Sequence, residues 1–195
     1  PWSEEEYKRS EKQQDDTGDP LEDARRFLVR SWQAHGGTMS QVSGWKQNGL
    51  RAKVYPARLW RKLPDRLLAV VDRLKQAEIR NRPALEVIAY YNHPACLIYA
   101  DPPYLLSTRA RKYYRYEMTD AEHIALLEAL CRHRGPVVLS GYAHPLYEES
   151  LIGWDRVTTP AVTEHGNTRL EVLWLNRRAA QARQLPLFHP CIECP

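Results

Sequence analysis

One stretch limits the fold of this chain more than any other: an apolar run that stops abruptly at a carboxylate and two prolines. Residues 95–100 read Ala-Cys-Leu-Ile-Tyr-Ala and lead into Asp101-Pro102-Pro103-Tyr104. A short apolar run bounded by prolines predicts a buried strand, because proline fixes φ and has no N–H to donate within a sheet. In open α/β sheets, ligands bind beyond the carboxyl ends of the strands. We therefore expect a binding or catalytic site at Asp101.

The four residues suit a planar group that carries an NH2. The Asp101 carboxylate and the Pro102 carbonyl can both accept its hydrogens, and Tyr104 can stack on the ring. Pro103 would keep the loop rigid. A base flipped out of duplex DNA is such a group. The alternative is a plain Asp-Pro turn that ends a strand and has no chemical role.

Composition sets wider limits. A chain of 195 residues with 43% apolar residues and no long Gly/Ser or Pro-rich linker fits one domain. Its net charge of +4 is compatible with a polyanionic partner without identifying one. Four unevenly placed cysteines, no signal peptide and no apolar run of membrane-spanning length lead us to expect a reduced, cytoplasmic protein.

The first part of the chain is expected to be helical. Residues 1–18 form a charged segment, and ordered structure is expected to begin near residue 19. Asp19 as N-cap and Pro20 in the first turn predict a helix to His35, ended by two glycines. Two short helices separated at Pro64 follow, and the second repeats apolar residues at helical spacing. These are Leu67, Leu68, Val71 and Leu74. Residues 76–80 are a weak strand candidate.

Two loops combine basic residues with aromatic rings, a mixture suited to DNA phosphates and unstacked bases. The loop at residues 36–56 carries Lys46 and Arg51 next to Trp45. The loop that follows Tyr104 is the stronger DNA-contact candidate. Its residues of interest are Arg109, Arg111, Lys112, Tyr113 and Arg115. An ordinary solvated loop is the alternative in both places.

The second part of the chain alternates helices and strands. A helix is expected at 83–91, burying Leu85, Val87 and Ile88, and another from the capping box of Thr119 and Glu122 to Arg132, burying Ile124, Leu127 and Leu130. Residues 136–142 predict a strand parallel to the first, which brings Ser140 near Asp101. No His or Cys is placed to activate Ser140, so a hydrolase is not favoured, and His123 is expected to be structural. Residues 154–161 and 169–176 predict an antiparallel hairpin at the sheet edge, its second strand covered on both faces.

Several stretches together resemble the Dam-like, adenine-specific DNA methyltransferases. They are Asn81-Arg82-Pro83-Ala84, the tetrapeptide, and residues 113–123, 138–142 and 169–176. The resemblance implies an α/β fold: a partial Rossmann-like class I methyltransferase sheet with a helical DNA-recognition insertion and a C-terminal β-hairpin. It implies a DNA-recognition region at 19–78, a catalytic half-domain at 79–178 and a tail at 179–195. It also implies S-adenosylmethionine as cofactor, double-stranded DNA as partner, no metal, and a second role for Asp101 in cofactor binding.

One expected motif is missing from the sequence. The nine glycines are scattered, and no Gly-x-Gly follows a strand, so the usual cradle for the cofactor's methionine part is absent. We therefore expect this chain by itself to be inactive and to need an N-terminal cofactor-binding segment. Nothing in residues 1–95 replaces the first, Gly-turn strand, so Leu97 and Ile98 are expected to lie on an exposed edge of the sheet. An inactive DNA-binding remnant, a cytosine-amino methyltransferase, and an enzyme acting on RNA or protein remain open alternatives. A restriction-linked, phage-borne or regulatory role stays equally open.

The tail contains a second, shorter resemblance. Gln184, Leu185, Leu187 and Phe188 resemble the short peptides that bind bacterial sliding clamps. Folding back over the domain's own core is the alternative for these apolar residues. Cys191 and Cys194, with His189 nearby, form a single pair and therefore a weak zinc signal.

Overall fold

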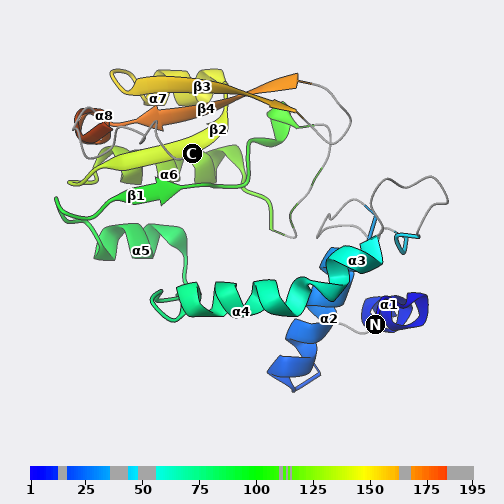
Figure 1. The fold of residues 1–195 in the computed structure, drawn as a ribbon. Coiled ribbons are helices and arrows are strands. Elements are labelled where there is room, and N and C mark those ends of the chain that lie inside the picture. The colour runs from blue at the N-terminus through cyan, green and yellow to red at the C-terminus, as the bar shows by residue number, and fades with distance from the viewer. Residues whose placement is uncertain are drawn as a thin grey trace, which may run out of the picture. The chain divides into compact units, whose positions relative to one another are not determined.

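The structure is a computed structural model of the chain (Figure 1), and it describes residues 1–12, 17–35, 44–47, 56–109, 112, 114, 116–162 and 168–183. These residues contain no helix long and apolar enough to span a membrane. The chain folds into two compact units, the first holding Pro1–Arg80 and the second beginning at Asn81.

The described elements of the first unit are helices: α1 (Glu4–Lys12), α2 (Pro20–Gln33), α3 (Pro56–Arg61) and α4 (Leu63–Leu74). The start of α2 is confirmed, because the Asp19 carboxylate accepts hydrogen bonds from the backbone N–H groups of Leu21 and Glu22. The expectation that order begins near residue 19 is wrong. Acidic residues fill the first turn of α1, and its Glu4–Lys8 and Glu5–Arg9 pairs lie one turn apart.

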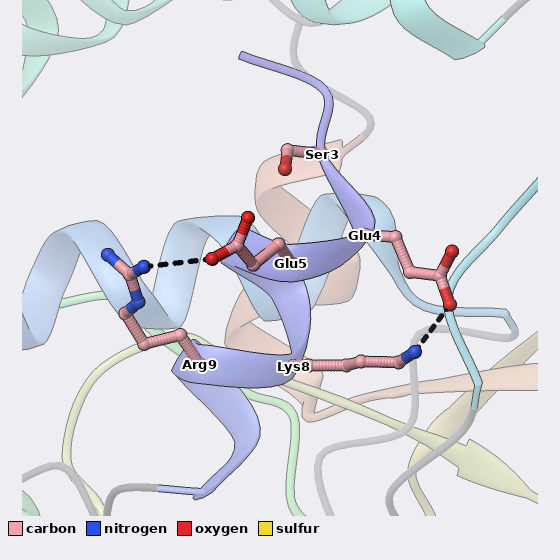
Figure 2. Close-up of a pocket in the computed structure, with 5 residues that line it drawn as sticks. All are labelled: Ser3, Glu4, Glu5, Lys8 and Arg9. Atoms are coloured by element: carbon pink, nitrogen blue, oxygen red, sulfur yellow. Dashed lines mark hydrogen bonds and ion pairs between the residues drawn. The ribbon is translucent and has the colours of Figure 1, made fainter.

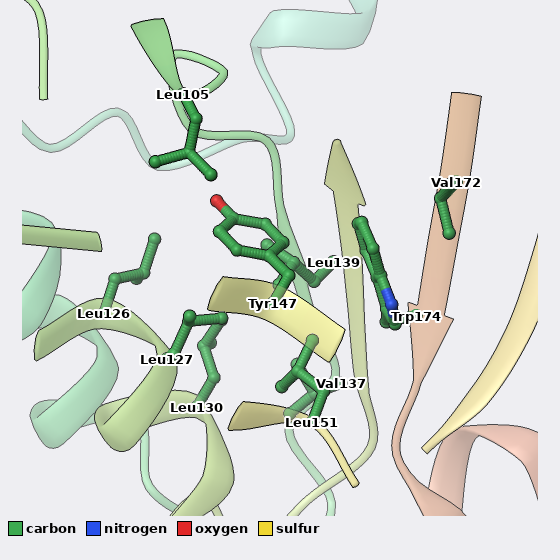
Figure 3. Close-up of a cluster of buried hydrophobic side chains, with 10 residues drawn as sticks. All are labelled: Leu105, Leu126, Leu127, Leu130, Val137, Leu139, Tyr147, Leu151, Val172 and Trp174. Atoms are coloured by element: carbon green, nitrogen blue, oxygen red, sulfur yellow. The ribbon is translucent and has the colours of Figure 1, made fainter. Parts of the chain in front are cut away.

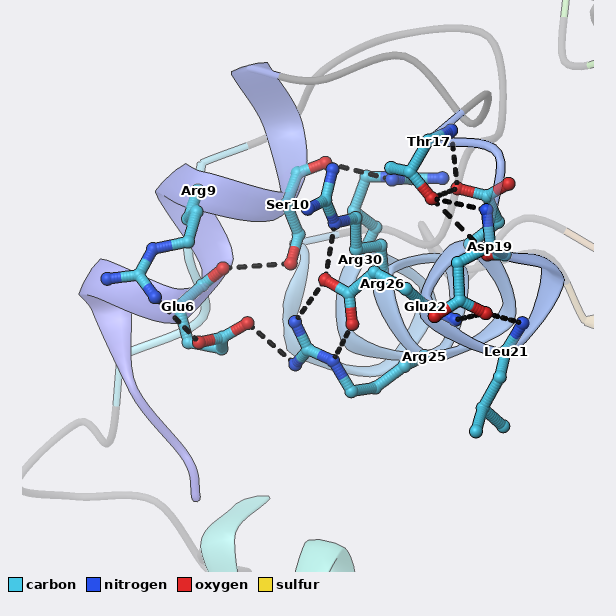
Figure 4. A network of polar contacts seen from close by, with 11 residues as sticks. Glu6, Arg9, Ser10, Thr17, Asp19, Leu21, Glu22, Arg25, Arg26 and Arg30 are labelled. Atoms are coloured by element: carbon cyan, nitrogen blue, oxygen red, sulfur yellow. Dashed lines mark hydrogen bonds and ion pairs between the residues drawn. The ribbon is translucent and has the colours of Figure 1, made fainter.

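Packing on α2 gives α1 its other support. Tyr7 of α1 is only 2% exposed. Figure 4 shows Arg25 of α2 between two carboxylates, at 2.6 Å from Glu6 and 2.7 Å from Glu22. Arg30 donates to the backbone carbonyl of Ser10. The charges of residues 1–12 therefore hold a helix in place, where composition alone indicated an unstructured segment.

The break between α3 and α4 falls at Lys62, not at Pro64 as predicted. Pro64 lies in the first turn of α4, where its missing N–H has no helical partner to lose. The repeated apolar residues of α4 stay largely exposed, Leu68 most of all. The weak strand candidate is also wrong, since residues 76–80 contain no strand.

The second unit is built on a four-stranded sheet of order β1-β2-β4-β3. The strands are β1 (Ile98–Ala100), β2 (Val137–Tyr142), β3 (Asp155–Val162) and β4 (Thr168–Leu175). β1 and β2 are parallel, with α6 (Asp120–Cys131) between them in the chain. β4 pairs antiparallel with both β2 and β3. The predicted parallel pair and edge hairpin are both confirmed.

Alternating side chains place a core on each face of this sheet. Val137, Leu139 and Trp174 pack on one face with leucines of α6 and with Tyr147 of α7 (Pro145–Ser150), as Figure 3 shows. Ile88 of α5 (Ala84–Tyr90) packs against the same cluster. Val138, Leu173 and Leu175 face the other way, toward α8 (Arg177–Arg183). As expected, β4 is covered on both faces.

Some burial expectations fail in this unit. The composition of β1 predicted a buried strand, but β1 is an outer strand of the described sheet, as expected if its neighbouring strand is missing, and Leu97 and Tyr99 are 62% and 61% exposed. Ile124 and Leu85 are exposed too, while Leu126 and His123 take the buried positions on α6. Leu127 and Leu130 are buried as predicted, so on α6 only Ile124 was misplaced. The short helices α7 and α8 were not predicted.

Candidate active site

Asp101 and Ser140 meet at the carboxyl ends of the two parallel strands. Ala100 of β1 is paired with Leu139 of β2, so the residues that follow them, Asp101 and Ser140, lie side by side. The Ser140 hydroxyl is 2.7 Å from Oδ1 of Asp101 and 3.2 Å from the carbonyl oxygen of Ala100. The expected proximity of Ser140 to Asp101 is confirmed.

The four residues of the tetrapeptide differ in how far they are buried. Pro102 is buried, Pro103 and Tyr104 are half-buried, and Asp101 is exposed. The Tyr104 ring meets the ring of Tyr142 edge-on, with centroids 4.7 Å apart and an interplanar angle of 79°. Burial raises the pKa of Tyr104 to about 12. The phenol is therefore neutral at ordinary pH, which suits a stacking and hydrogen-bonding role.

A cleft of about 800 Å³ adjoins the tetrapeptide. It runs along β1 between α5 and α6, and its lining is mainly apolar, including Val87, Ile88 and Met118. Asp101, Pro102 and Pro103 belong to this lining as well. The site thus joins a carboxylate at a strand end to an apolar cavity large enough for a nucleoside-sized ligand.

A second hollow lies in the first unit and has a simpler explanation. Figure 2 shows it on α1, where its charged side chains are joined in pairs, Glu4 with Lys8 and Glu5 with Arg9. These pairs satisfy one another on an exposed helix surface. Nothing in this hollow indicates chemistry.

Another serine, Ser107, lies close to a histidine, and the geometry argues against a nucleophile. The Nε2 atom of His144 is 3.1 Å from the Ser107 hydroxyl, while Nδ1 accepts the backbone N–H of Leu146. Because Nδ1 is an acceptor, a neutral His144 carries its proton on Nε2 and donates it to Ser107. His144 is then no base for this hydroxyl. His123, expected to be structural, is buried against the Tyr147 hydroxyl.

The residues expected to contact DNA lie in different settings. The side chain of Arg109 is only 5% exposed and forms a two-pronged ion pair with Glu117. Lys46 and Lys112 are exposed. Arg51, Arg111, Tyr113 and Arg115 lie outside the described residues, as do the tail residues Gln184, Leu185, Leu187 and Phe188. The burial of Arg109 suits a loop anchor better than a phosphate contact.

Sequence reasoning did not single out Tyr142 or Glu117. The signal for Tyr142 was present: once two strands are parallel and Ser140 is beside Asp101, the residue two positions later lies on the same side of β2. Glu117 offered no comparable signal, since its pairing with Arg109 depends on how the loop between them closes.

The sequence of this chain matches a known protein family. A family described as D12 class N6 adenine-specific DNA methyltransferase matches residues 2–152, well over half of the chain. The chain belongs to this family. No curated protein sequence matches it. Membership confirms the resemblance to adenine-specific DNA methyltransferases, and it makes methyl transfer to adenine in DNA the general activity to which the site must be related.

Methyltransferases of the D12 class normally use S-adenosylmethionine, and the cleft fits part of that molecule. Its apolar walls suit an adenosine ring, and the Asp101 carboxylate suits a positively charged sulfonium. Glu122 also lines the cleft, but its Oε2 already accepts two hydrogen bonds from Thr119. The described lining therefore suits the apolar and cationic parts of the cofactor better than its ribose and methionine ends.

Proposed function

We propose that this chain is the catalytic part of a site-specific DNA adenine methyltransferase that acts on the exocyclic amine of a flipped adenine. One observation carries the proposal: in a chain of the D12 class, the Asp101 carboxylate is held by Ser140 at a strand end, beside Tyr104 and an apolar cleft. A partial Rossmann-like sheet and a helical recognition region within residues 19–78 belong to the same proposal.

The chemistry assigned to the tetrapeptide is orientation and charge stabilisation. Asp101 and the Pro102 carbonyl accept the two amine hydrogens, which turns the nitrogen lone pair toward the incoming methyl group. They also stabilise the positive charge that develops as the nitrogen becomes tetrahedral. Tyr104 stacks on the base, and Pro103 keeps the loop rigid. S-adenosylmethionine, when bound, would supply an electrophilic methyl group: the nitrogen lone pair forms the new N–C bond as the sulfur–methyl bond breaks and sulfur keeps that electron pair. The methylated nitrogen then loses one proton, and neither a metal nor a covalent enzyme intermediate is required.

DNA binding is assigned to exposed basic residues of the two loops. Lys46 and Lys112 have the exposure that a phosphate contact needs, and Arg51, Arg111, Tyr113 and Arg115 stay in the proposal on their sequence positions. Arg109 is kept as the anchor of its loop through Glu117. Docking of Gln184–Phe188 on a sliding clamp is a separate proposal, and a synthetic peptide of that segment tests it directly.

The first prediction tests Asp101 in a complete protein that contains this chain and binds the cofactor. There Asp101→Ala should abolish methyl transfer while DNA affinity changes less than about twofold, because the carboxylate acts on the amine and not on phosphates. Asp72→Ala is the matched control, since Asp72 is an exposed helix residue paired with Lys75. Transfer of labelled methyl groups to duplex DNA and a filter-binding titration give the two measurements. Normal adenine methylation by the Asp101 variant would overturn the assignment.

A second candidate, an inactive DNA-binding remnant, is favoured by the position of β1. A catalytic strand at the outer edge of the sheet leaves the cleft open along one side. In that case both the unaltered protein and the Asp101 variant bind DNA and neither transfers a methyl group.

A further inference from the structure

The proposed role of Asp101 requires one fixed carboxylate position, and its own exposure does not provide one. An exposed aspartate can take several staggered rotamers of comparable energy. Transfer to an amine depends on reacting groups held within a fraction of an ångström, and a displacement of about 1 Å can cost roughly 100-fold in rate. Some neighbouring group must therefore select one rotamer.

Ser140 has the geometry to make this selection. It is 5% exposed, it sits within β2, and its hydroxyl lies 2.7 Å from Oδ1 of Asp101. The same hydroxyl is 3.2 Å from the Ala100 carbonyl, but it has one proton, and the shorter contact to a charged oxygen is the stronger one. Oδ1 is thereby occupied, and Oδ2 is left for the hydrogen of an amine.

Tyr142 contacts Tyr104 from β2, as Ser140 contacts Asp101. Side chains two residues apart share one side of a strand, so Tyr142 follows Ser140 along the side that faces the tetrapeptide. Its ring meets Tyr104 edge-on at 4.7 Å. Gly141, between them, faces the core so closely that an added Cβ would lie 3.2 Å from Trp174 and 3.3 Å from Tyr147. The strand end is therefore packed firmly against the core rings.

We propose that Ser140 and Tyr142 are positioning residues of the methyl-transfer site, Ser140 fixing the rotamer of Asp101 and Tyr142 fixing the ring of Tyr104. This inference rests on the proposed function, because Asp101 and Tyr104 receive their roles there. It assigns the two contacts different effects. Ser140 governs the transfer step, and Tyr142 governs capture of the base.

Single-turnover methylation and base-flipping measurements separate these effects. Ser140→Ala should lower the single-turnover rate about 10- to 100-fold with DNA affinity and melting temperature nearly unchanged. Ser150→Ala is the matched control, because its hydroxyl donates to a carbonyl within α7.

Tyr142→Leu should instead weaken the fluorescence rise of 2-aminopurine placed at the target adenine, and Tyr142→Phe, which keeps the ring, should recover it. Equal rates for Ser140→Ala and the unaltered protein would overturn the role of Ser140. A full fluorescence rise with Tyr142→Leu would overturn the role of Tyr142.

If the protein transfers no methyl group, the proposed function fails, but the role of Ser140 can still be tested by crystallography. The crystal structures show whether the Asp101 side chain has one conformer or several. We expect one Asp101 conformer in the unaltered protein and several in Ser140→Ala. A single, unmoved Asp101 conformer in the variant would show that Ser140 does not select it.

Discussion

At the scale of single residues, the pKa of the Tyr104 phenol can be measured without any ligand, and it tests the contact with Ser140. Its pKa is raised to about 12, mainly by burial, while Ser140, whose hydroxyl can turn from Asp101 to donate to an ionised Tyr104, acts in the opposite direction. Ser140→Ala removes that donor, and the pKa of Tyr104 should rise further. NMR titration of ring-labelled tyrosine, assigned with Tyr104→Phe, measures this shift. A pKa that falls in Ser140→Ala would contradict the contact between the two side chains.

His123 gives a second prediction at this scale. It is fully buried against the Tyr147 hydroxyl, and burial lowers its pKa from the ordinary value near 6.5. A histidine that the fold holds neutral makes its full contribution to the free energy of unfolding above pH 6.5. That stability is lost as the pH falls from 6.5 toward the lowered folded pKa, because the unfolded chain takes up the proton first.

Melting temperature measured between pH 8 and pH 5 tests this linkage. His123→Leu should flatten that part of the curve, whatever it does to stability at neutral pH. His35→Leu, which replaces an exposed histidine, is the control for the loss of an imidazole side chain. An unchanged slope in His123→Leu would assign the acid loss of stability to other groups.

Several site residues could be predicted from sequence because their placement follows from strand ends. Asp101 and Ser140 meet since two apolar runs separated by one helix form a parallel pair, and parallel strands end at the same edge. Arg109 could not be placed this way. Whether an arginine in a loop faces solvent or pairs with Glu117 depends on a tertiary contact that charge patterning does not encode.

At the scale of elements, the turn before β2 leaves no room for a side chain at Gly135. A Cβ on Gly135 would lie 2.1 Å from the carbonyl oxygen of Cys96 and 2.7 Å from that of His93. Both obstacles are backbone atoms of the turn that leads into β1, and the same Cys96 oxygen is 2.9 Å from Nε2 of His133. The two turns therefore fix how the parallel strands start.

Gly135→Ala should accordingly destabilise the protein by about 3 kcal/mol, the upper end of the usual overpacking cost. Gly153→Ala is the control, because Gly153 has a φ of +85° with no atom near a built Cβ. Its cost should be limited to left-handed strain of about 1 kcal/mol. Urea denaturation followed by circular dichroism compares them. Equal losses for the two variants would refute the steric argument.

Helix starts were predicted well because their signals are local. The Asp19 cap and the capping box of Thr119 and Glu122 occur where the sequence places them. The existence of α1 was missed although its acidic first turn and its Glu4–Lys8 and Glu5–Arg9 pairs are local signals, because its contacts with α2 lie outside any local window. On α6, Leu127 and Leu130 are buried as predicted, but His123 rather than Ile124 takes the buried position in the first turn, through its bond to Tyr147, a residue of another helix.

At the scale of the whole molecule, the described sheet is open along β1, and this sets an expectation for cofactor binding. The cleft offers Asp101 and apolar walls, and the sequence has no Gly-rich turn for the methionine part. So few contacts seldom offset the several kcal/mol lost when a ligand is immobilised. The isolated chain should therefore bind S-adenosylmethionine weakly or not at all, yet still bind DNA in a salt-sensitive way. Calorimetry decides the first point, and clear micromolar binding would contradict it.

The fold class was predicted because patterns of short apolar runs and helix caps repeat along the second half of the chain. The sheet order of the described strands, β1-β2-β4-β3, follows from one parallel pair and one hairpin. Two signals for β1 disagreed. Its apolar residues have the composition of a buried strand, whereas the missing Gly-turn strand predicted an exposed edge, and the order of the described strands agrees with the exposed edge.

The outer position of β1 also gives hydrogen exchange a way to detect binding at the strand that leads to Asp101. β2 and β4 are bonded to strands on both sides, whereas β1 is bonded to β2 alone among the described strands. Amides that face away from β2 in residues 97–100 should exchange quickly, ahead of those in β2 and β4. Any molecule or segment that docks along this edge will slow these few amides. Mass spectrometry of the peptide spanning them then registers its arrival before any methyl group is transferred.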